Sequence, residues 1–257
     1  PSIDDIPPVL WHLKKENIPI IGICGGDGTI HQVITGIINI WGKGRLPLIL
    51  VLPCGTMNNV ARTLSMKGKG PAVLRRVIQL LELGKELPTS VRFTMNIEDR
   101  YCFLFGCGFT SNFLDAVYGG TEKGFIQNCR VIGSAIKDII TKRDGGPLFR
   151  PLHATVAIDG RLLTYKQVTG ILSGTVEHIG MGFSPMPRGT EPGTFQSIVT
   201  AMGSRSILIN INRLRKGDRI RHRHHTDVCC CHLSIQADEP FRFTMDGDMY
   251  SSPGKVD

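Results

Sequence analysis

The chain has 257 residues, of which 41% are hydrophobic and 20% are charged, and these proportions are ordinary for a soluble globular protein. Its apolar runs are far shorter than the roughly 20 residues of a membrane-spanning helix, and no charged-then-apolar leader opens it, so we expect neither a transmembrane segment nor a secretion signal. The formal net charge of +8 favours an anionic partner. No basic stripe is interleaved with aromatic residues, which argues against nucleic acid and for phosphates or lipid headgroups.

The first part of the chain, residues 1–88, alternates strand-like and helix-like patterns. The run IPIIGIC (18–24) predicts a short buried strand, and the apolar residues from Ile30 to Ile38 follow helical spacing. PLILVLP (47–53) predicts a second strand, followed by helical segments over 58–64 and 72–83. This alternation is typical of a parallel sheet with helices on its faces.

After Pro88 the hydrophobic period changes to two, which indicates antiparallel β structure over residues 89–257. We expect three hairpins, between 91–97 and 101–105, around Asp159-Gly160, and between 231–237 and 241–245. One helix interrupts them, with an apolar stripe made of Ile126, Val131, Ile132, Ala135, Ile136, Ile139 and Ile140. The prediction is therefore two domains, an α/β domain over 1–88 and a mainly antiparallel β domain over 89–257.

The turn GGDGT, Gly25 to Thr29, lies where the first strand meets a helix N-terminus. Glycines there let a phosphate approach backbone N–H groups, and the helix dipole favours its negative charge. A carboxylate is repelled by a polyphosphate unless Mg²⁺ lies between them or the carboxylate takes part in proton transfer. Both arrangements occur in phosphoryl transfer. The structural alternative is a glycine-rich turn in which Asp27 is only a helix N-cap.

A second turn of the same kind, in LPCGTMNNVAR (52–62), follows the next strand. Gly55 and Thr56 form the turn, and Asn58 and Asn59 open a helix. Because ligands of open α/β sheets bind beyond the carboxyl ends of the strands, we expect the two turns to converge on one crevice.

At this point the sequence resembles the diacylglycerol kinase catalytic family, which includes sphingosine, ceramide and bacterial lipid kinases and shares its fold with NAD kinases. GGDGT, the P-x-GT-x-N turn about thirty residues later, and MDGD (245–248) carry the resemblance, which extends over essentially the whole chain. It implies a Rossmann-like α/β domain followed by a β-sandwich-like domain, with ATP and Mg²⁺ as cofactors.

The resemblance also implies roles for individual residues. The nucleotide-phosphate loop would be formed by Gly25, Gly26, Asp27, Gly28 and Thr29, and the adjoining nucleotide wall by Gly55, Thr56 and Asn58. Asp246 would be the general base that takes the proton from a lipid hydroxyl, with Asp248 positioning it. Asp27 and Asp248 would lie at Mg²⁺. Without the resemblance, DGD reads as a plain hairpin turn at the end of a strand.

The chain departs from the family pattern at several places. Asn59 stands where the family usually has aspartate, and Glu191, Pro192 and Gly193 replace a loop that ends in Asp-Gly. These changes put one carboxylate of the site and any second, structural metal in doubt. The family's first strand and its asparagine-proline turn do not precede the first helix, so the sequence has the pattern of a chain trimmed at both ends.

A basic and histidine-rich stretch, RLRKGDRIRHRHH (213–225), holds six Lys and Arg residues. In a strand, Arg219, Arg221 and Arg223 would share one face, which suits an anionic membrane surface; the alternative is a solvated edge strand. The nearby run Cys229 to Cys231 with its histidines matches no paired zinc-ligand spacing, and we expect the eight cysteines to be reduced thiols.

The prediction is a cytoplasmic, peripherally membrane-associated lipid kinase that transfers the γ-phosphate of ATP to a hydroxyl of a diacylglycerol-like or sphingoid-like lipid. Two alternatives stay open: an NAD kinase-like enzyme, and a non-catalytic nucleotide or lipid sensor, which Asn59 and Pro192 favour.

Overall fold

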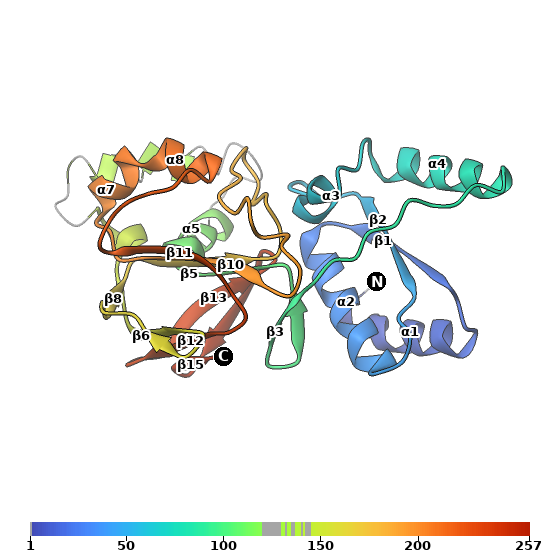
Figure 1. Cartoon of the computed structure of the whole chain (residues 1–257), viewed down its shortest axis with the longest axis horizontal. Helices are drawn as coiled ribbons and strands as arrows, with labels where there is room; N and C mark the ends of the chain where they lie inside the picture. The colour runs from blue at the N-terminus through green and yellow to red at the C-terminus, as the bar shows by residue number, and fades with distance from the viewer. Residues whose placement is uncertain (1, 120–129, 132, 135–136, 140, 142–144) are drawn as a thin grey trace.

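The computed structural model describes residues 2–119, 130–131, 133–134, 137–139, 141 and 145–257. Figure 1 shows two lobes side by side, with the N-terminal lobe (blue to cyan) on the right and the C-terminal lobe (green to red) on the left. Residues 85–94, which form no helix or strand, run from one lobe to the other. The predicted boundary at residue 88 falls in this segment, and the division into two domains stays a prediction.

The N-terminal lobe is built on two parallel strands, paired in register from Ile20 opposite Leu48 to Gly25 opposite Pro53. Helices lie on both sides of the strands, and apolar side chains such as Ile23, Ile30 and Val51 form its core. The lobe comprises η1 (Ile3–Asp5), α1 (Ile6–Lys15), β1 (Ile20–Gly25), α2 (Asp27–Trp41), β2 (Leu48–Pro53), α3 (Asn59–Thr63) and α4 (Gly70–Glu82). The predicted α/β alternation is confirmed.

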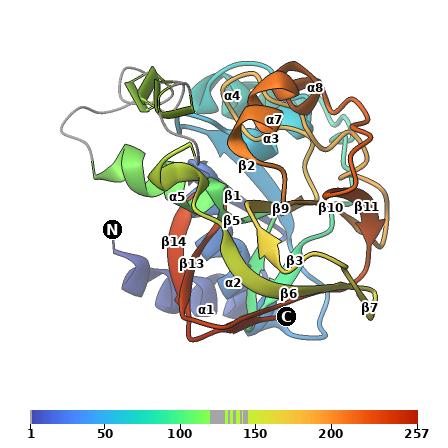
Figure 2. The same cartoon turned by 90° about the vertical axis from the view of Figure 1, so that its left-hand side faces the viewer.

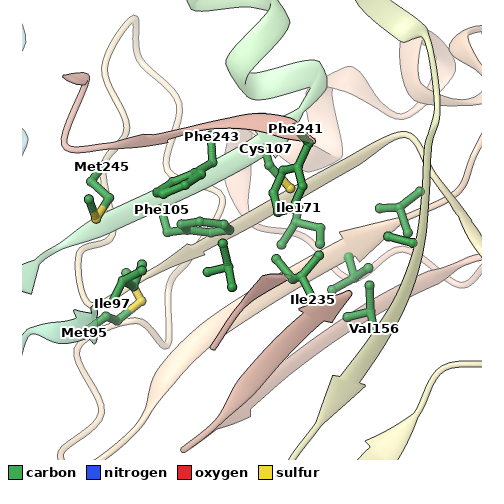
Figure 3. Packing of buried hydrophobic residues seen from close by; sticks show 14 of the residues in the cluster. Met95, Ile97, Phe105, Cys107, Val156, Ile171, Ile235, Phe241, Phe243 and Met245 are labelled. Atoms are coloured by element: carbon green, nitrogen blue, oxygen red, sulfur yellow. The ribbon is translucent and has the colours of Figure 1, made fainter. Parts of the chain in front are cut away.

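The C-terminal lobe contains two antiparallel sheets packed face to face. The first has the strand order β11-β10-β9-β5-β13-β14 and the second β15-β12-β6-β7, with β8 paired to β6. Their bounds are β5 (Leu104–Gly108), β6 (Leu152–Ile158), β7 (Arg161–Leu162), β8 (Gln167–Val168), β9 (Gly170–Gly174), β10 (Phe195–Thr200), β11 (His225–Cys230), β12 (Leu233–Ala237), β13 (Phe241–Met245), β14 (Asp248–Ser252) and β15 (Lys255–Val256). Figure 3 shows the core between them, where Phe105 and Phe243 lie opposite Ile235 and Val156.

Helices cover the outer face of the six-stranded sheet (Figure 2). They are α5 (Phe109–Tyr118), α7 (Ser204–Ile209) and α8 (Ile211–Lys216), with the short η2 (Pro147–Phe149) beside α5. Of the predicted apolar stripe, Val131 and Ile139 are helical and buried. The other members, Ile126, Ile132, Ala135, Ile136 and Ile140, lie outside the described residues. Among the helices that the structure describes, none has both the length and the apolar character needed to cross a bilayer.

Two of the three predicted hairpins form. The first consists of β3 (Met95–Ile97) and β4 (Arg100–Cys102), which is shorter than predicted because Val91 and Phe93 are exposed in the crossing segment and Phe105 pairs in the large sheet. The second, β6–β7, turns at Asp159 and Gly160, both at positive φ.

The third predicted hairpin is wrong. β12 pairs with β6 and β15, whereas β13 pairs with β5 and β14, so the two strands lie in different sheets. Their apolar residues face each other across the core instead of pairing edge to edge, as Ile235 and Phe243 show in Figure 3.

The prediction of a strand through the basic stretch is also wrong. Residues 211–216 form α8, which ends at Gly217 in the left-handed region, and β11 begins only at His225. Arg219, Arg221 and Arg223 lie in the exposed connection between them.

Candidate active site

The two glycine turns meet beyond the ends of β1 and β2. A Cβ at Gly55 would lie 2.4 Å from Gly26 Cα, and a Cβ at Gly26 would lie 3.3 Å from Gly55 Cα, so no larger residue fits at Gly55 without displacing the facing turn. Asn58, at φ 50°, closes the second turn: its Oδ1 accepts from Gly55 N–H at 3.0 Å and its Nδ2 donates to Gly55 O at 2.7 Å. The structure therefore brings the two turns together, as the sequence predicts.

The first turn lies at the N-terminus of the 15-residue helix α2. Ile30 N–H bonds to Gly26 O, which leaves the earlier amides of the helix without partners inside it. Thr29 packs over Gly25, where a side chain would lie 2.5 Å from Thr29 Cβ. Thr29 and Thr56 are both exposed at the mouth of the crevice.

Asp27 connects the first turn to the helix after the second. Its Oδ2 accepts from Asn59 N–H at 3.0 Å and its Oδ1 from Val60 N–H at 3.2 Å, so it caps α3, whose own N-cap side chain makes no capping bond. Asp27 is thus the first residue of α2, but the helix that its side chain caps is α3. Burial raises the pKa of Asp27, against the lowering effect of these backbone hydrogen bonds.

The acidic turn joins β13 to β14, with Asp246 and Gly247 both at positive φ. The Asp246 side chain is buried, and its two oxygens accept from Phe103 N–H at 3.0 and 3.2 Å. Burial raises the pKa of Asp246 well above its usual range, and the negative charges of Asp27 and Asp248 raise it further. Tyr118 Oη donates to Gly247 O at 2.7 Å and fixes the outer side of the turn.

Asp248 lies against the N-terminus of α2. Gln32 Nε2 donates to its Oδ2 at 3.1 Å, and a Cβ at Gly28 would lie 2.9 Å from its Oδ1, so the absence of a side chain at Gly28 makes room for the carboxylate. Three carboxyl groups from residues 27, 246 and 248 therefore converge where the lobes meet.

Sequence reasoning missed three residues of this site: His31, Gln32 and Tyr250. His31 is fully buried; its Nδ1 lies 3.0 Å from Tyr101 O and its Nε2 2.9 Å from Tyr250 Oη. Because a carbonyl only accepts, Nδ1 carries the proton and Nε2 accepts from the Tyr250 hydroxyl. Tyr250 Oη in turn accepts from Gln32 Nε2 at 3.0 Å.

Burial lowers the pKa of His31, which keeps its imidazole neutral 3.7 Å from Asp246 Oδ2. The sequence did contain a signal for it. His31, Thr35 and Asn39 are polar residues four apart on a helix rich in isoleucine, and that spacing puts them on one face.

The site has groups suited to binding a phosphate. The bare backbone at Gly26 and Gly55 and the N-terminus of α2 suit an anion, and Asp27 and Asp248 suit the few protein ligands that Mg²⁺ usually takes beside phosphate and water. Across the described ranges, no group of three or more His, Cys, Asp or Glu side chains is arranged to hold a metal by itself. The residues thus fit a metal that arrives with a nucleotide.

Comparisons with known proteins agree with this arrangement. Residues 8–85 match the family model of the diacylglycerol kinase catalytic domain. The chain is similar to two solved structures of a candidate diacylglycerol kinase from Bacillus anthracis strain Sterne, with TM-scores of 0.74 and 0.72 at 17% and 16% identity, each match covering 100% of this chain and 80% of the other. The search of curated proteins found no match.

These findings confirm the resemblance read from the sequence and the fold class predicted from it, an N-terminal α/β part followed by a sheet-rich part.

Proposed function

We propose that this chain, which carries the diacylglycerol kinase catalytic match over residues 8–85, is the catalytic unit of a lipid kinase that transfers the γ-phosphate of ATP to a lipid hydroxyl. One observation carries the proposal. The acidic turn, more than 200 residues from the glycine turn in sequence, reaches the N-terminus of α2, where Gln32 donates to Asp248. Groups suited to a phosphate and groups suited to a hydroxyl proton therefore lie side by side.

The residues divide into three roles. The amides around Gly26 and Gly55 bind the phosphates of the nucleotide, while Asp27 holds α3 and hence the second turn in place. Mg²⁺, held by Asp248 with Asp27 nearby, would supply charge neutralisation on the phosphates when bound. Positioning the acceptor hydroxyl against the γ-phosphate is the remaining task, and it falls to the acidic turn.

Asp246 is the proposed proton acceptor. Its raised pKa makes its ionised form a stronger base than an ordinary aspartate, and a cation bound nearby would favour that ionised form. The Phe103 amide holds its carboxyl group in one orientation, with the neutral His31 3.7 Å away. Asp248, less buried than Asp246, lies against the N-terminus of α2 and would orient the metal and the hydroxyl.

The lipid acceptor is proposed to be diacylglycerol-like or sphingoid-like and to be reached at an anionic membrane surface. Six exposed basic residues on α8 and the connection after it favour such a surface, and Ile209 beside them is 81% exposed. They are Arg213, Arg215, Lys216, Arg219, Arg221 and Arg223, here called the basic segment. Peripheral membrane association and a cytoplasmic location belong to the same proposal.

The test is transfer of labelled γ-phosphate from Mg²⁺-ATP into extracted lipids. Labelled lipid is expected from the parent, with a loss of at least about 100-fold in Asp246→Asn, because general-base catalysis contributes roughly that much or more. Asp115→Asn, which alters an aspartate on α5 paired with Arg242, is the matched control and should retain activity.

A second candidate, a nucleotide-binding protein without turnover, is favoured by the burial of Asp246 and by the engagement of both Asp27 oxygens with backbone amides. ATP binding with no labelled lipid, and with NAD also inert as acceptor, would establish this candidate in place of the kinase.

A further inference from the structure

Cys24 and Cys54 form a thiol pair directly beneath the two glycine turns. Cys24 is the residue before Gly25 at the end of β1, and Cys54 is the residue before Gly55 just after β2. Their Sγ atoms lie 2.9 Å apart and both residues are exposed. The backbone supports the contact, since Cys54 N–H donates to Gly25 O at 3.1 Å.

The surroundings distinguish the two sulfurs. Cys54 Sγ lies against the first residue of the 13-residue helix α4, where a Cβ at Gly70 would come within 2.7 Å of it. The hydrogen bond with Cys54 is the main reason why the pKa of Cys24 is raised. Cys54 Sγ, which lies at the N-terminus of α4, is therefore the sulfur placed to react first with a peroxide, and Cys24 is placed to react with the oxidised Cys54.

We infer that Cys24 and Cys54 are a redox modification site, oxidised by hydroperoxides to a disulfide that weakens nucleotide binding at the adjacent turns. The second half of this inference rests on the proposed nucleotide site. The first half stands on the geometry of the two sulfurs alone.

Hydrogen peroxide is the oxidant that accepts the two electrons lost by the thiols. The Cys54 thiolate attacks one oxygen of hydrogen peroxide, the O–O bond breaks, and the products are a sulfenic acid on Cys54 and, after protonation, water. The Cys24 sulfur then attacks the Cys54 sulfur, the S–S bond forms, the S–O bond breaks, and a second water leaves. The two thiols lose two electrons and two protons, and one peroxide becomes two waters.

The effect on binding follows from the position of the pair. A disulfide needs the sulfurs at about 2.05 Å, so its formation draws the ends of β1 and β2 together by an approach of roughly 1 Å at the sulfurs. Gly26 and Gly55 already approach each other closely, since a Cβ at Gly55 would lie only 2.4 Å from Gly26 Cα. Tightening the strand ends opposes the separation of the turns that a phosphate between them requires.

Oxidation can be mapped directly, because trypsin separates the two cysteines into the peptides 16–43 and 46–62. The full chain is reduced, exposed to hydrogen peroxide, alkylated and digested, and mass spectrometry is expected to show these two peptides joined. Cys54→Ser should abolish the joined species. Cys231→Ser, which removes another exposed cysteine, is the matched control and should leave it unchanged.

Binding is then measured by titrating ATP into the reduced and the oxidised protein. The oxidised form is expected to bind roughly tenfold more weakly, a coupling of ordinary size between two sites. By reciprocity, saturating ATP should lower the equilibrium ratio of disulfide to dithiol in a glutathione redox buffer by the same factor. Cys54→Ser should bind ATP as the reduced parent does, with or without peroxide.

The outcomes test the modification site and its effect on nucleotide binding separately. If peptides 16–43 and 46–62 are never joined while Cys231 is oxidised, the modification site is refuted. If they are joined but both forms bind ATP equally, the coupling is refuted and the site remains. If neither form binds ATP, the nucleotide site of the proposed function fails, and peptide mapping still decides the thiol pair.

Discussion

Asp246 combines a buried carboxyl group with two carboxylate neighbours, which is an unfavourable place for a negative charge. Its side chain is only 2% exposed, and burial, Asp27 and Asp248 all act to raise its pKa. Among the residues that the structure describes, its donors are backbone amides, chiefly that of Phe103. Ionisation of Asp246 in this environment lowers the stability of the folded protein, and a bound cation restores it.

The pH dependence of folding follows from this raised pKa. A carboxyl group whose pKa is raised in the folded state stabilises fully below its unfolded pKa, and this contribution is lost as the pH rises through the folded pKa. Asparagine suffers no such loss and keeps one acceptor for Phe103 N–H. The free energy of unfolding of Asp246→Asn relative to the parent should therefore increase with pH, by up to about 1.4 kcal/mol per pH unit above about pH 3.9.

Urea denaturation at several pH values between 4 and 8, without metal, measures this difference. A relative stability that stays constant over the whole range would contradict the raised pKa, even if the same variant had lost all kinase activity.

At this scale the sequence predicts the residues that carry recognisable chemistry and misses those that support them. Asp27, Asp246 and Asp248 follow from motifs, whereas His31 and Tyr250 become meaningful only once α2 and β14 are side by side. Their hydrogen bond joins positions 219 residues apart, and no local pattern encodes such a pairing.

The two glycine turns act as one structural element because they are in contact. Gly55→Ala would place a methyl group 2.4 Å from Gly26 Cα, and backbone on both sides leaves it nowhere to go. We expect ATP binding to weaken by roughly tenfold or more and the free energy of unfolding to fall by about 1–3 kcal/mol, the usual cost of overpacking. Isothermal titration with ATP and thermal denaturation measure the two effects.

Gly203→Ala is the control for that substitution. Gly203 has a φ of −65°, and a Cβ there would meet nothing within 4 Å, so the change should leave both quantities within error. If Gly55→Ala behaves in the same way, the two turns are further apart in solution than in this structure.

A polar stripe on α2 joins the two lobes. His31, Thr35 and Asn39 lie four residues apart and bond to the β3–β4 hairpin: His31 to Tyr101 O, Thr35 Oγ1 to Tyr101 N–H at 2.9 Å, and Asn39 Nδ2 to Asp99 O at 3.0 Å. Since β4 leads directly to Phe103 and β5, this seam sets the position of the amide that holds Asp246.

Thr35→Val tests the seam, because valine keeps the shape of threonine and leaves Tyr101 N–H without its acceptor. An unpaired, partly buried amide costs about 1–3 kcal/mol, and we expect a loss of this size in the free energy of unfolding, with a matching fall in phosphate transfer. Thr35→Ser keeps the hydroxyl and should recover most of both. A loss in the serine variant with none in the valine variant would show that packing of the methyl group, and not the hydrogen bond, matters here.

Among the elements, local signals predict well and long-range pairing does not. The β6–β7 hairpin follows from Asp159-Gly160, because this dipeptide itself adopts the turn. The turn at 238–240 also looks local, yet it carries the chain from one sheet to the other, since each strand finds a better partner elsewhere. The strand interpretation of the basic stretch is wrong for a similar reason, because residues 211–216 form α8 and Leu214 packs against a buried apolar cluster of the C-terminal lobe.

For the whole molecule, the net charge of +8 sets how it meets its surroundings. The charge is not spread evenly, because six of its basic residues lie in the basic segment on the C-terminal lobe. Another group, Lys67, Lys69, Arg75 and Arg76, lies on and before α4 of the N-terminal lobe, where Leu74 and Ile78 are also exposed. Each lobe thus has a cationic surface with apolar side chains beside it. The proposed function assigns membrane binding to the basic segment of the C-terminal lobe.

Sedimentation with lipid vesicles distinguishes these surfaces. Replacing Arg215, Arg219 and Arg221 by alanine removes three charges from the basic segment, and replacing Lys67, Arg75 and Arg76 removes three from the α4 surface, so the two variants have the same net charge. At about 1 kcal/mol per basic residue near an anionic membrane, the first variant should bind phosphatidylserine vesicles roughly 100-fold more weakly than the parent, and the second should bind nearly as well. Binding of the parent should also fall steeply between 0.1 and about 0.5 M salt as the charges are screened. Equal losses in the two variants would mean that net charge alone drives binding, and a loss confined to the second would place the membrane-facing surface on the nucleotide-binding lobe.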